Sequence, residues 1–293
     1  MKSWLAAALV VLATAGPAWS GTMGVFVSIL PQKYFVEKIG GSLVKASVLV
    51  APGASPHSYE PKPGQMVELS RARLYFAIGV NFEEVWLDKI QAANPGLKVV
   101  HTEKGVEKIA MMEHHHEDGE MEAEEGSEEE HEGLDPHIWT SPLEVKIIAR
   151  NMMEALVEAD PENAAAYAGN FQAFSRELDD VDRELREALA GREGMRFMVF
   201  HPAWGYLARD YGLRQVPVEL EGKEPKPAQL KELIERARKD GIKVIFVQPQ
   251  FSSKSAEVIA KAIGGRVVFA DPLAYEWTDN LRMQAARFKE ALR

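Results

Sequence analysis

The chain has 293 residues, 46% of them hydrophobic, no cysteine, and a formal net charge of −10, which is long enough for two domains with buried cores. Without cysteine there are no disulfides and no metal-bound thiolates, so any transition-metal site must use histidine, carboxylate or water ligands. Eleven of the 44 acidic residues lie between positions 113 and 132, which leaves the rest close to charge balance with no basic patch for nucleic acid.

Residues 1–20 have the pattern of a secretory signal peptide. Lys2 precedes an apolar stretch from Leu5 to Ala13, and Ala18-Trp19-Ser20 fits the small-x-small cleavage pattern. The stretch is too short to cross a bilayer, which takes about 20 residues, and no cysteine follows it that could carry a lipid. We expect cleavage of this segment and a mature chain located in the periplasm.

Short apolar runs then alternate with amphipathic stretches. This alternation predicts a mainly parallel sheet with helices on its faces. The expected strands cover 25–30, 45–50, 74–78 and 97–100, the expected helices cover 31–39, 65–70 and 82–92, and a loop rich in Pro and Gly covers 52–64.

The middle of the chain combines a low-complexity segment with a long helical one. Residues 113–133 are rich in acids and histidines and have no apolar periodicity, which predicts a disordered loop. Residues 141–191 are helical in pattern and are broken once, where Pro161 should start a new helix with Asp160 as its N-cap. That second helix would have about 30 residues and measure roughly 45 Å, a stiff connection.

The β/α alternation resumes after residue 192. Strands are expected at 196–200, 214–218, 243–247 and 266–269, and helices at 203–211, 227–239, 253–263 and from 278. The predicted fold is therefore α/β, with two β/α sandwich lobes of mainly parallel sheets joined by one long rigid helix. The predicted divisions are a signal peptide at 1–20, an N-terminal lobe at 21–140, a helical segment at 141–191 and a C-terminal lobe at 192–293.

Three of the eight histidines share a structural context. His57, His137 and His201 each lie in a loop or just beyond a predicted strand, next to a proline, and Asp271 is placed similarly. The carboxyl ends of strands are where open α/β sheets bind ligands, and a neighbouring proline restricts the backbone. Spacing alone leaves two hypotheses open, a shared site and ordinary Pro-rich turns. His101 is interpreted as a capping or surface residue.

Five segments resemble the cluster A-I solute-binding proteins of ABC metal importers, in particular the ZnuA-type zinc-binding proteins. They are PGASPHSYEPKPGQM at 52–66, LDPHIWTSP at 134–142, FHPAWGYLARDYGL at 200–213, EGKEPKPAQLKEL at 221–233 and ADPLA at 270–274. The resemblance implies two α/β lobes joined by a rigid helix, with the metal between them. It also implies that His57, His137 and His201 are ligands and that Asp271 is a possible fourth.

The ligand types favour Zn²⁺ over Mn²⁺. Manganese-binding relatives tend to have Glu where this chain has His201, and three imidazoles with at most one carboxylate suit zinc. Asp271, Glu60 and water remain open as the fourth ligand. Residues that could support the ligands from behind are Glu60, Asp135, Trp139, Trp204 and Glu276, with the tryptophans interpreted mainly as packing residues.

The acidic loop contains His114, His115, His116 and His131. Zinc-type members of the family often have such an insertion at this place. One hypothesis is that these side chains collect zinc at low affinity near the cleft, and the other is a solvated charged segment without a metal role.

The resemblance implies a monomeric, non-enzymatic protein that passes zinc to an ABC importer permease with only small lobe movements. Two other functions stay open besides a manganese-binding role. A periplasmic zinc hydrolase could use three histidines and an open position, although no His-Glu-x-x-His motif is present. A periplasmic zinc buffer would need no permease.

Overall fold

The computed structural model describes residues 21–111, 133–219 and 223–292. The expected signal peptide and the loop histidines His114, His115, His116 and His131 lie outside the described residues. No helix within the described ranges is both long and apolar enough to cross a membrane.

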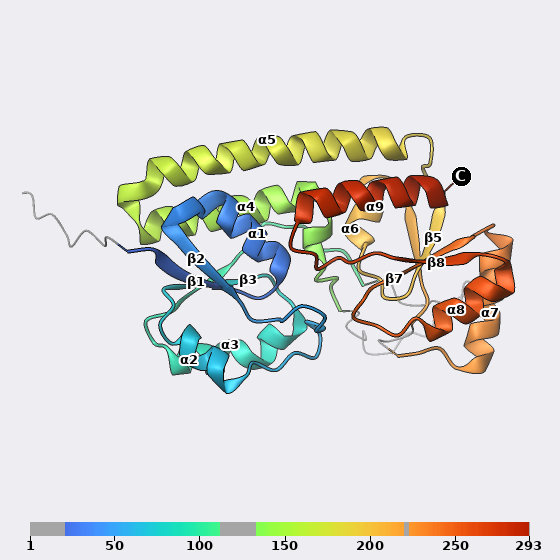
Figure 1. Cartoon of the computed structure of the whole chain (residues 1–293), viewed down its shortest axis with the longest axis horizontal. Helices are drawn as coiled ribbons and strands as arrows, with labels where there is room; N and C mark the ends of the chain where they lie inside the picture. The colour runs from blue at the N-terminus through green and yellow to red at the C-terminus, as the bar shows by residue number, and fades with distance from the viewer. Residues whose placement is uncertain (1–20, 112–132, 220–222, 293) are drawn as a thin grey trace, which may run out of the picture.

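Two four-stranded sheets, each with every strand parallel, form the two lobes (Figure 1). The first sheet has the order β2-β1-β3-β4 and the second has the equivalent order β6-β5-β7-β8. The strands of the first are β1 (Met23–Val27), β2 (Val44–Val48), β3 (Leu74–Ala77) and β4 (Lys98–His101), and those of the second are β5 (Arg196–Val199), β6 (Arg214–Pro217), β7 (Val244–Val247) and β8 (Arg266–Phe269). The predicted fold class is confirmed.

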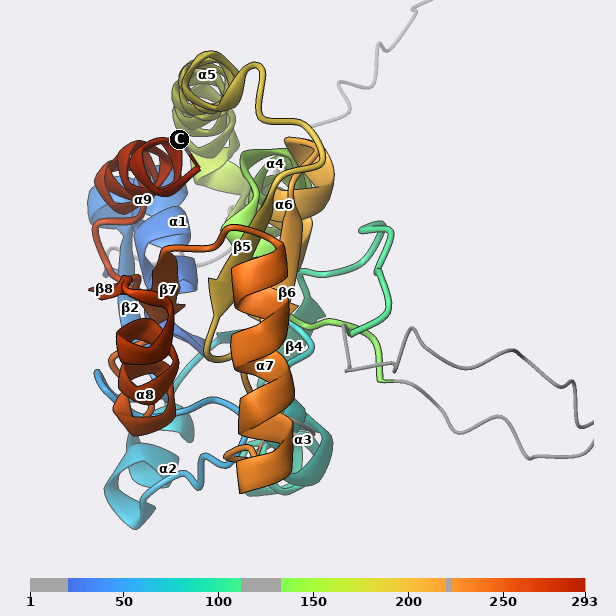
Figure 2. The ribbon, with the colours of Figure 1, turned by 90° about the vertical axis from the view of Figure 1, so that its right-hand side faces the viewer.

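Helices cover both faces of each sheet, because alternate strand residues bury opposite sides. In the second sheet Phe197 and Val199 pack with α6 and α9, whereas Met198 packs with α7 and α8 (Figure 2). The helices of the first lobe are α1 (Leu30–Gly40), α2 (Pro63–Leu69) and α3 (Asn81–Ala93), and those of the second are α6 (Gly205–Asp210), α7 (Pro227–Lys239), α8 (Lys254–Ile263) and α9 (Trp277–Ala291). A 3₁₀ turn, η1 (Gly41–Leu43), links α1 to β2.

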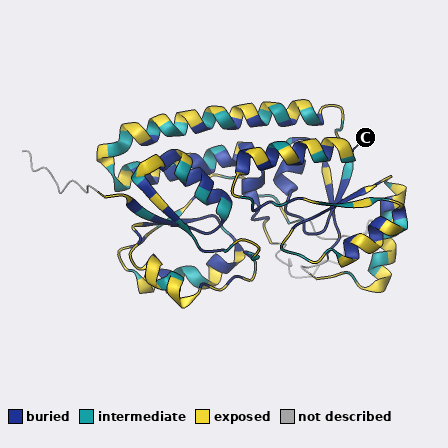
Figure 3. Cartoon of the chain, viewed as in Figure 1, coloured by how far each residue is buried: buried dark blue, intermediate teal, exposed yellow. Residues whose placement is uncertain are grey.

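Two further helices connect the lobes. The 3₁₀ turn η2 (Ile138–Thr140) leads into α4 (Pro142–Ala159), and η3 (Pro161–Asn163) leads into α5 (Ala164–Leu189), which runs above both lobes. The 26 residues of α5 span about 39 Å. Its buried side chains recur every three to four residues and face inward, while its outer face is exposed (Figure 3); they are Tyr167, Phe174, Leu178, Val181, Leu185 and Leu189.

The start of this helix differs from the prediction. Pro161 begins the 3₁₀ turn η3, and the α-helix starts three residues later. The Asp160 side chain does not cap the helix; its Oδ2 accepts hydrogen bonds from the Tyr167 hydroxyl at 2.7 Å and from Asn163 Nδ2 at 2.8 Å. The Tyr167 hydroxyl, one turn into the helix, therefore binds the Asp160 carboxylate, which the sequence pattern had assigned to the backbone amides at the helix start.

One hydrophobic core crosses from lobe to lobe. Trp277 at the start of α9 packs edge-to-face on Phe35 of α1, with ring centroids 5.2 Å apart, and at the other end of α9 Phe288 packs on Phe197. The Tyr34 hydroxyl also lies 2.7 Å from Thr278 Oγ1. These contacts, together with α5, favour a rigid relation between the lobes.

Candidate metal centre

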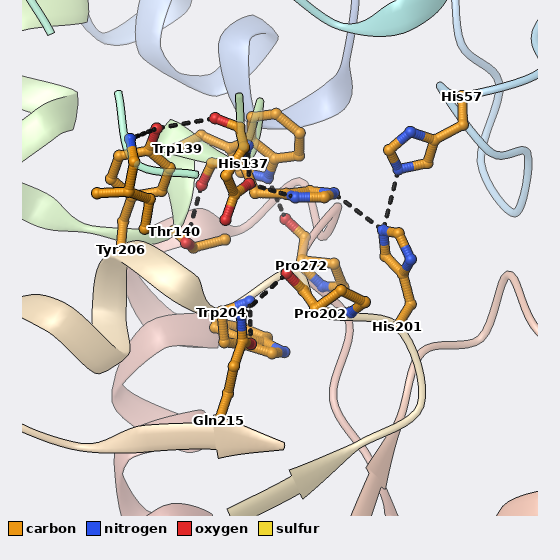
Figure 4. A network of polar contacts seen from close by, with 12 residues as sticks. His57, His137, Trp139, Thr140, His201, Pro202, Trp204, Tyr206, Gln215 and Pro272 are labelled. Carbon is orange, nitrogen blue, oxygen red and sulfur yellow. Dashed lines mark hydrogen bonds and ion pairs between the residues drawn. The ribbon is translucent and has the colours of Figure 1, made fainter. Parts of the chain in front are cut away.

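Three imidazole rings from distant parts of the chain point at one another between the lobes (Figure 4). His57 lies in the loop after β2, His137 directly precedes η2, and His201 lies just past the end of β5. The Nε2 atom of His201 is 3.0 Å from that of His57 and 3.1 Å from that of His137. Ligand atoms sharing a tetrahedral zinc ion at 2.0–2.1 Å would be about 3.3 Å apart, so the rings already have nearly the spacing of a metal site.

Each of these rings is held from behind by an oxygen atom. The Nδ1 atoms lie 2.7 Å from Asn81 Oδ1 for His57, 2.7 Å from Asp135 Oδ1 for His137, and 2.6 Å from Glu219 Oε1 for His201. Amide and carboxylate oxygens only accept hydrogen bonds, so Nδ1 must carry the proton in every ring. A neutral imidazole has one proton, and Nε2 is therefore left with a lone pair.

The three lone pairs consequently face one another without a proton between them. Three lone pairs that face one another repel each other unless a cation lies between them. Histidine that binds a metal through one nitrogen typically donates the other N–H to a carboxylate or carbonyl, which is the pattern seen here.

Burial reinforces the neutral state of the rings. Removal from water is the largest cause lowering the pKa of His57, His137 and His201 below the usual 6.5, because the charged imidazolium loses its solvation. The second cause differs: for His57 it is the neighbouring His201 ring, which lowers the pKa further, whereas for His137 and His201 the carboxylates of Asp135 and Glu219 partly oppose the shift. The rings are therefore unprotonated, as metal ligands must be, down to a more acidic pH than free histidine.

The backbone around two of the ligands is fixed as firmly as their rings. Asp135 Oδ1 also accepts the His137 backbone N–H at 2.8 Å. Gln248, buried at the end of β7, accepts the His201 N–H and donates to the His201 carbonyl. Phe251 stacks on the His201 ring with a centroid distance of 4.8 Å. His137 and His201 are therefore preorganised on rigid elements.

The space left beside the rings is small. A cavity of about 10 Å³ is lined by all three histidines together with Pro56, Trp139, Gln250, Phe251 and Pro272, among others. That is about the volume needed for one water molecule. The cavity thus has room for one water-sized particle and not for an organic substrate.

Comparison with known proteins places the chain in a family. Residues 25–291 match the family ZnuA, described as zinc-uptake complex component A, periplasmic. The chain belongs to the ZnuA family. It is 30% identical over 257 residues to the high-affinity zinc uptake system protein ZnuA of Bacillus subtilis, covering 83% of this chain and 76% of that protein.

Other similar proteins extend the ZnuA match. The zinc-binding protein AdcA of Streptococcus pyogenes is 28% identical over 263 residues, which is 86% of this chain and 51% of AdcA, so the chain spans about half the length of that relative. A crystal structure of ZnuA has a TM-score of 0.85 and 42% identity and covers 93% of this chain and all of that one. A deletion mutant of ZnuA with zinc bound has a TM-score of 0.83, also at 42% identity, and covers 92% of this chain and 98% of that one.

Among the residues singled out by sequence in this ZnuA-family chain, Asp271 stands apart from the triad. It is not among the ligand atoms that lie within 4.8 Å of one another, a group made up of His57, His137 and His201. Its Oδ1 instead accepts hydrogen bonds from Gln250 Nε2 at 3.0 Å and from the Leu273 N–H at 2.9 Å.

The remaining candidates divide into one that supports the triad and four that do not hold a ligand nitrogen. Asp135 supports His137, as described above. Glu60 and Glu276 are exposed, and neither Trp139 nor Trp204 holds a ligand nitrogen, since both are buried packing residues. His101, at the end of β4, is exposed and pairs with Glu103 at 2.9 Å.

Four polar residues at the site were missed by sequence reasoning, among them Gln248, which directly follows β7. Asn81 is the first residue of α3 and lies four residues past β3, Glu219 lies two residues past β6, and Gln250 lies three residues past β7. A signal was available, because each is a polar residue beyond the carboxyl end of a strand, as His57 and His201 are.

Proposed function

We propose that this protein captures Zn²⁺ with His57, His137 and His201 in the periplasm and delivers it to the permease of an ABC importer. The observation that carries the proposal is the convergence of three Nε2 lone pairs at 3.0 and 3.1 Å, each fixed by an oxygen behind its ring. The family match and the zinc-binding relatives support the cargo and the transport role.

The donor set supports zinc over manganese. Three neutral imidazoles suit Zn²⁺, whereas Mn²⁺ prefers more oxygen ligands. The carboxylates of Asp135 and Glu219 are occupied behind the rings, which leaves nitrogen as the dominant donor at the centre. Bound zinc would be cargo, held between the lobes until the permease distorts the site.

The geometry also supports a carrier over a hydrolase. A zinc hydrolase needs an open coordination position for substrate and a general base close to the bound water. Here the cavity of about 10 Å³ admits no ester or peptide, and both buried carboxylates beside the triad are engaged with Nδ1 atoms. A zinc buffer would share the same site, so only transport separates it from a carrier.

The division of the chain into lobes at 21–140 and 192–293, with 141–191 as a stiff connection, belongs to this proposal. The shared core and α5 support small lobe movements during loading. We also propose cleavage after residue 20, a monomeric state, and low-affinity zinc collection by His114, His115, His116 and His131. An unchanged zinc-capture rate and ion count after deletion of 113–132 would refute the collecting role.

Elemental analysis of the purified protein is the direct test. Wild-type protein should hold about one tightly bound zinc per chain, and the alanine variants of His57, His137 and His201 should each lose it. The transport role is tested by growth of a strain lacking the gene in zinc-poor medium, with wild-type and His201→Ala copies restored. Normal growth without the gene would exclude a transport component and favour a buffer.

A further inference from the structure

Gln250 is a lining residue of two separate cavities. It lines the small cavity of the three histidines, and it also lines a cavity of about 150 Å³ between the lobes, together with Asp271, Leu273 and Val50. Gln250 therefore lies where the ion site and the wider interlobe space approach each other.

The nitrogen and the oxygen of the Gln250 side-chain amide differ in their hydrogen bonding. Its Nε2 donates to Asp271 Oδ1 at 3.0 Å, whereas its Oε1 is inaccessible to solvent and, among the described residues, has no hydrogen-bond partner. A buried acceptor without a donor is costly and calls for a partner such as a water or an ion. A water on the ion would be such a donor.

Asp271 is committed to holding this amide. Its Oδ1 accepts from both Gln250 and the Leu273 N–H, and the side chain belongs to the lining of the interlobe cavity and not to that of the ion cavity. The bond from Gln250 Nε2 fixes the orientation of the amide, because the donor end must face the carboxylate. The oxygen end is thereby left for a different partner, and none is present among the described residues.

Charge balance gives an independent reason for a neutral fourth group. Asp135 and Glu219, both buried, already place two carboxylates behind the triad. A divalent cation offsets two negative charges, and a third carboxylate on the ion would leave one uncompensated in a site removed from water. A water held by an amide oxygen adds no charge.

We propose that Gln250 is a positioning residue whose Oε1 accepts a hydrogen bond from a water in the fourth position of the ion, and that Asp271 acts by orienting Gln250 and not as a ligand. This inference rests on the proposed function, since it concerns the same ion. The ion would then have three nitrogen ligands and one neutral oxygen ligand, and the Asp271 carboxylate would act on it only through Gln250.

The test is a zinc competition titration of the full chain with four variants, Gln250→Leu, Asp271→Ala, Asp271→Asn and His201→Ala. Gln250→Leu and Asp271→Ala should each weaken zinc binding by about tenfold, as losses of supporting partners do. Asp271→Asn should restore binding to within about threefold of wild type, because its Oδ1 can still accept from Gln250 and Leu273.

A carboxylate ligand gives the opposite pattern. Loss of more than about tenfold in Asp271→Asn, or unchanged affinity in Gln250→Leu, would overturn the proposal. Cobalt(II) bound to Asp271→Asn should keep the visible spectrum of the wild-type complex, since the coordinating atoms are the same; a changed spectrum would also overturn it. Failure of the proposed function is seen separately, as wild-type protein that binds no zinc or a His201→Ala variant that binds it normally.

Discussion

Gly205, at the start of α6, offers a way to disturb one ligand without touching it. A Cβ at this position would lie 2.5 Å from Asp135 Oδ2, well inside van der Waals contact. That oxygen has no hydrogen-bond partner among the described residues, so only Oδ1, which accepts from His137, ties the carboxylate to a neighbour. Gly205→Ala should therefore displace the Asp135 carboxylate first.

The size of the effect follows from the distances. Restoring an ordinary contact of about 3.5 Å requires the carboxylate to move by about 1 Å. A shift of about 1 Å away from His137 would stretch the 2.7 Å bond at Nδ1 beyond hydrogen-bonding range. Loss of such a partner weakens metal binding by about 10–100-fold, or about 1.4–2.7 kcal/mol, and the added methyl costs about 1–3 kcal/mol of folding stability.

A zinc competition titration combined with thermal unfolding separates the two effects. The matched control is Gly169→Ala on the exposed side of α5, where an added Cβ meets nothing within 4 Å. It should leave zinc affinity unchanged and stabilise the helix by about 0.5–1 kcal/mol. A Gly205→Ala protein that is less stable but binds zinc within about twofold of wild type would refute the positioning role of Asp135.

Three further predictions concern charge and pH. Glu219→Gln keeps an acceptor for His201 Nδ1 but removes the charge, so zinc affinity should fall by about tenfold in a competition titration, while the exposed control Glu60→Gln should show no change. Because burial lowers the pKa of the triad histidines below 6.5, zinc affinity should be constant from neutral pH down to 6.5 and fall only below it; titrations showing a steep rise between pH 7 and 8 would contradict this. Burial raises the pKa of Glu83 to about 7, so the folded state holds its proton more tightly and stability should decline by up to about 3 kcal/mol as pH rises from 4.5 to 7. Glu83→Gln should lack that decline when the variants' unfolding midpoints are compared across the same pH range.

The β/α layout could be predicted because its signals are local. Apolar runs of four to five residues followed by amphipathic stretches correspond to the eight strands named above to within a few residues, and the helix at 227–239 has the predicted bounds. The start of α5 could not be predicted, because the choice of Asp160 between backbone amides and the Tyr167 hydroxyl depends on where the phenol lies after folding.

At the site, too, the sequence predicts which residue types are present but not where their side chains point. His57, His137 and His201 could be grouped by their place in loops or just beyond strands and by family resemblance. That context applied equally to Asp271, whose side chain accepts a hydrogen bond from Gln250. Sequence gives the residue type at a strand end and not the direction of its side chain. The partners of the ring nitrogens, such as Glu219, are fixed only by that direction.

The construction of the centre explains why a cation would be bound strongly and also why it would act on the whole fold. His137 and His201 are anchored through buried carboxylates, while His57 lies in the loop after β2 of the first sheet and is held by the amide of Asn81. Without an ion, three lone pairs and two carboxylates share a site removed from water, which costs free energy. A divalent ion offsets that cost only when all three rings meet, so its binding free energy also joins the two lobes. Zinc at about 1,000 times its dissociation constant would add about 4 kcal/mol to the stability of the folded state. The same coupling means that a partner which draws the His57 loop away from His201 would weaken binding of the ion. His137 and His201, held by their carboxylates, would not need to move.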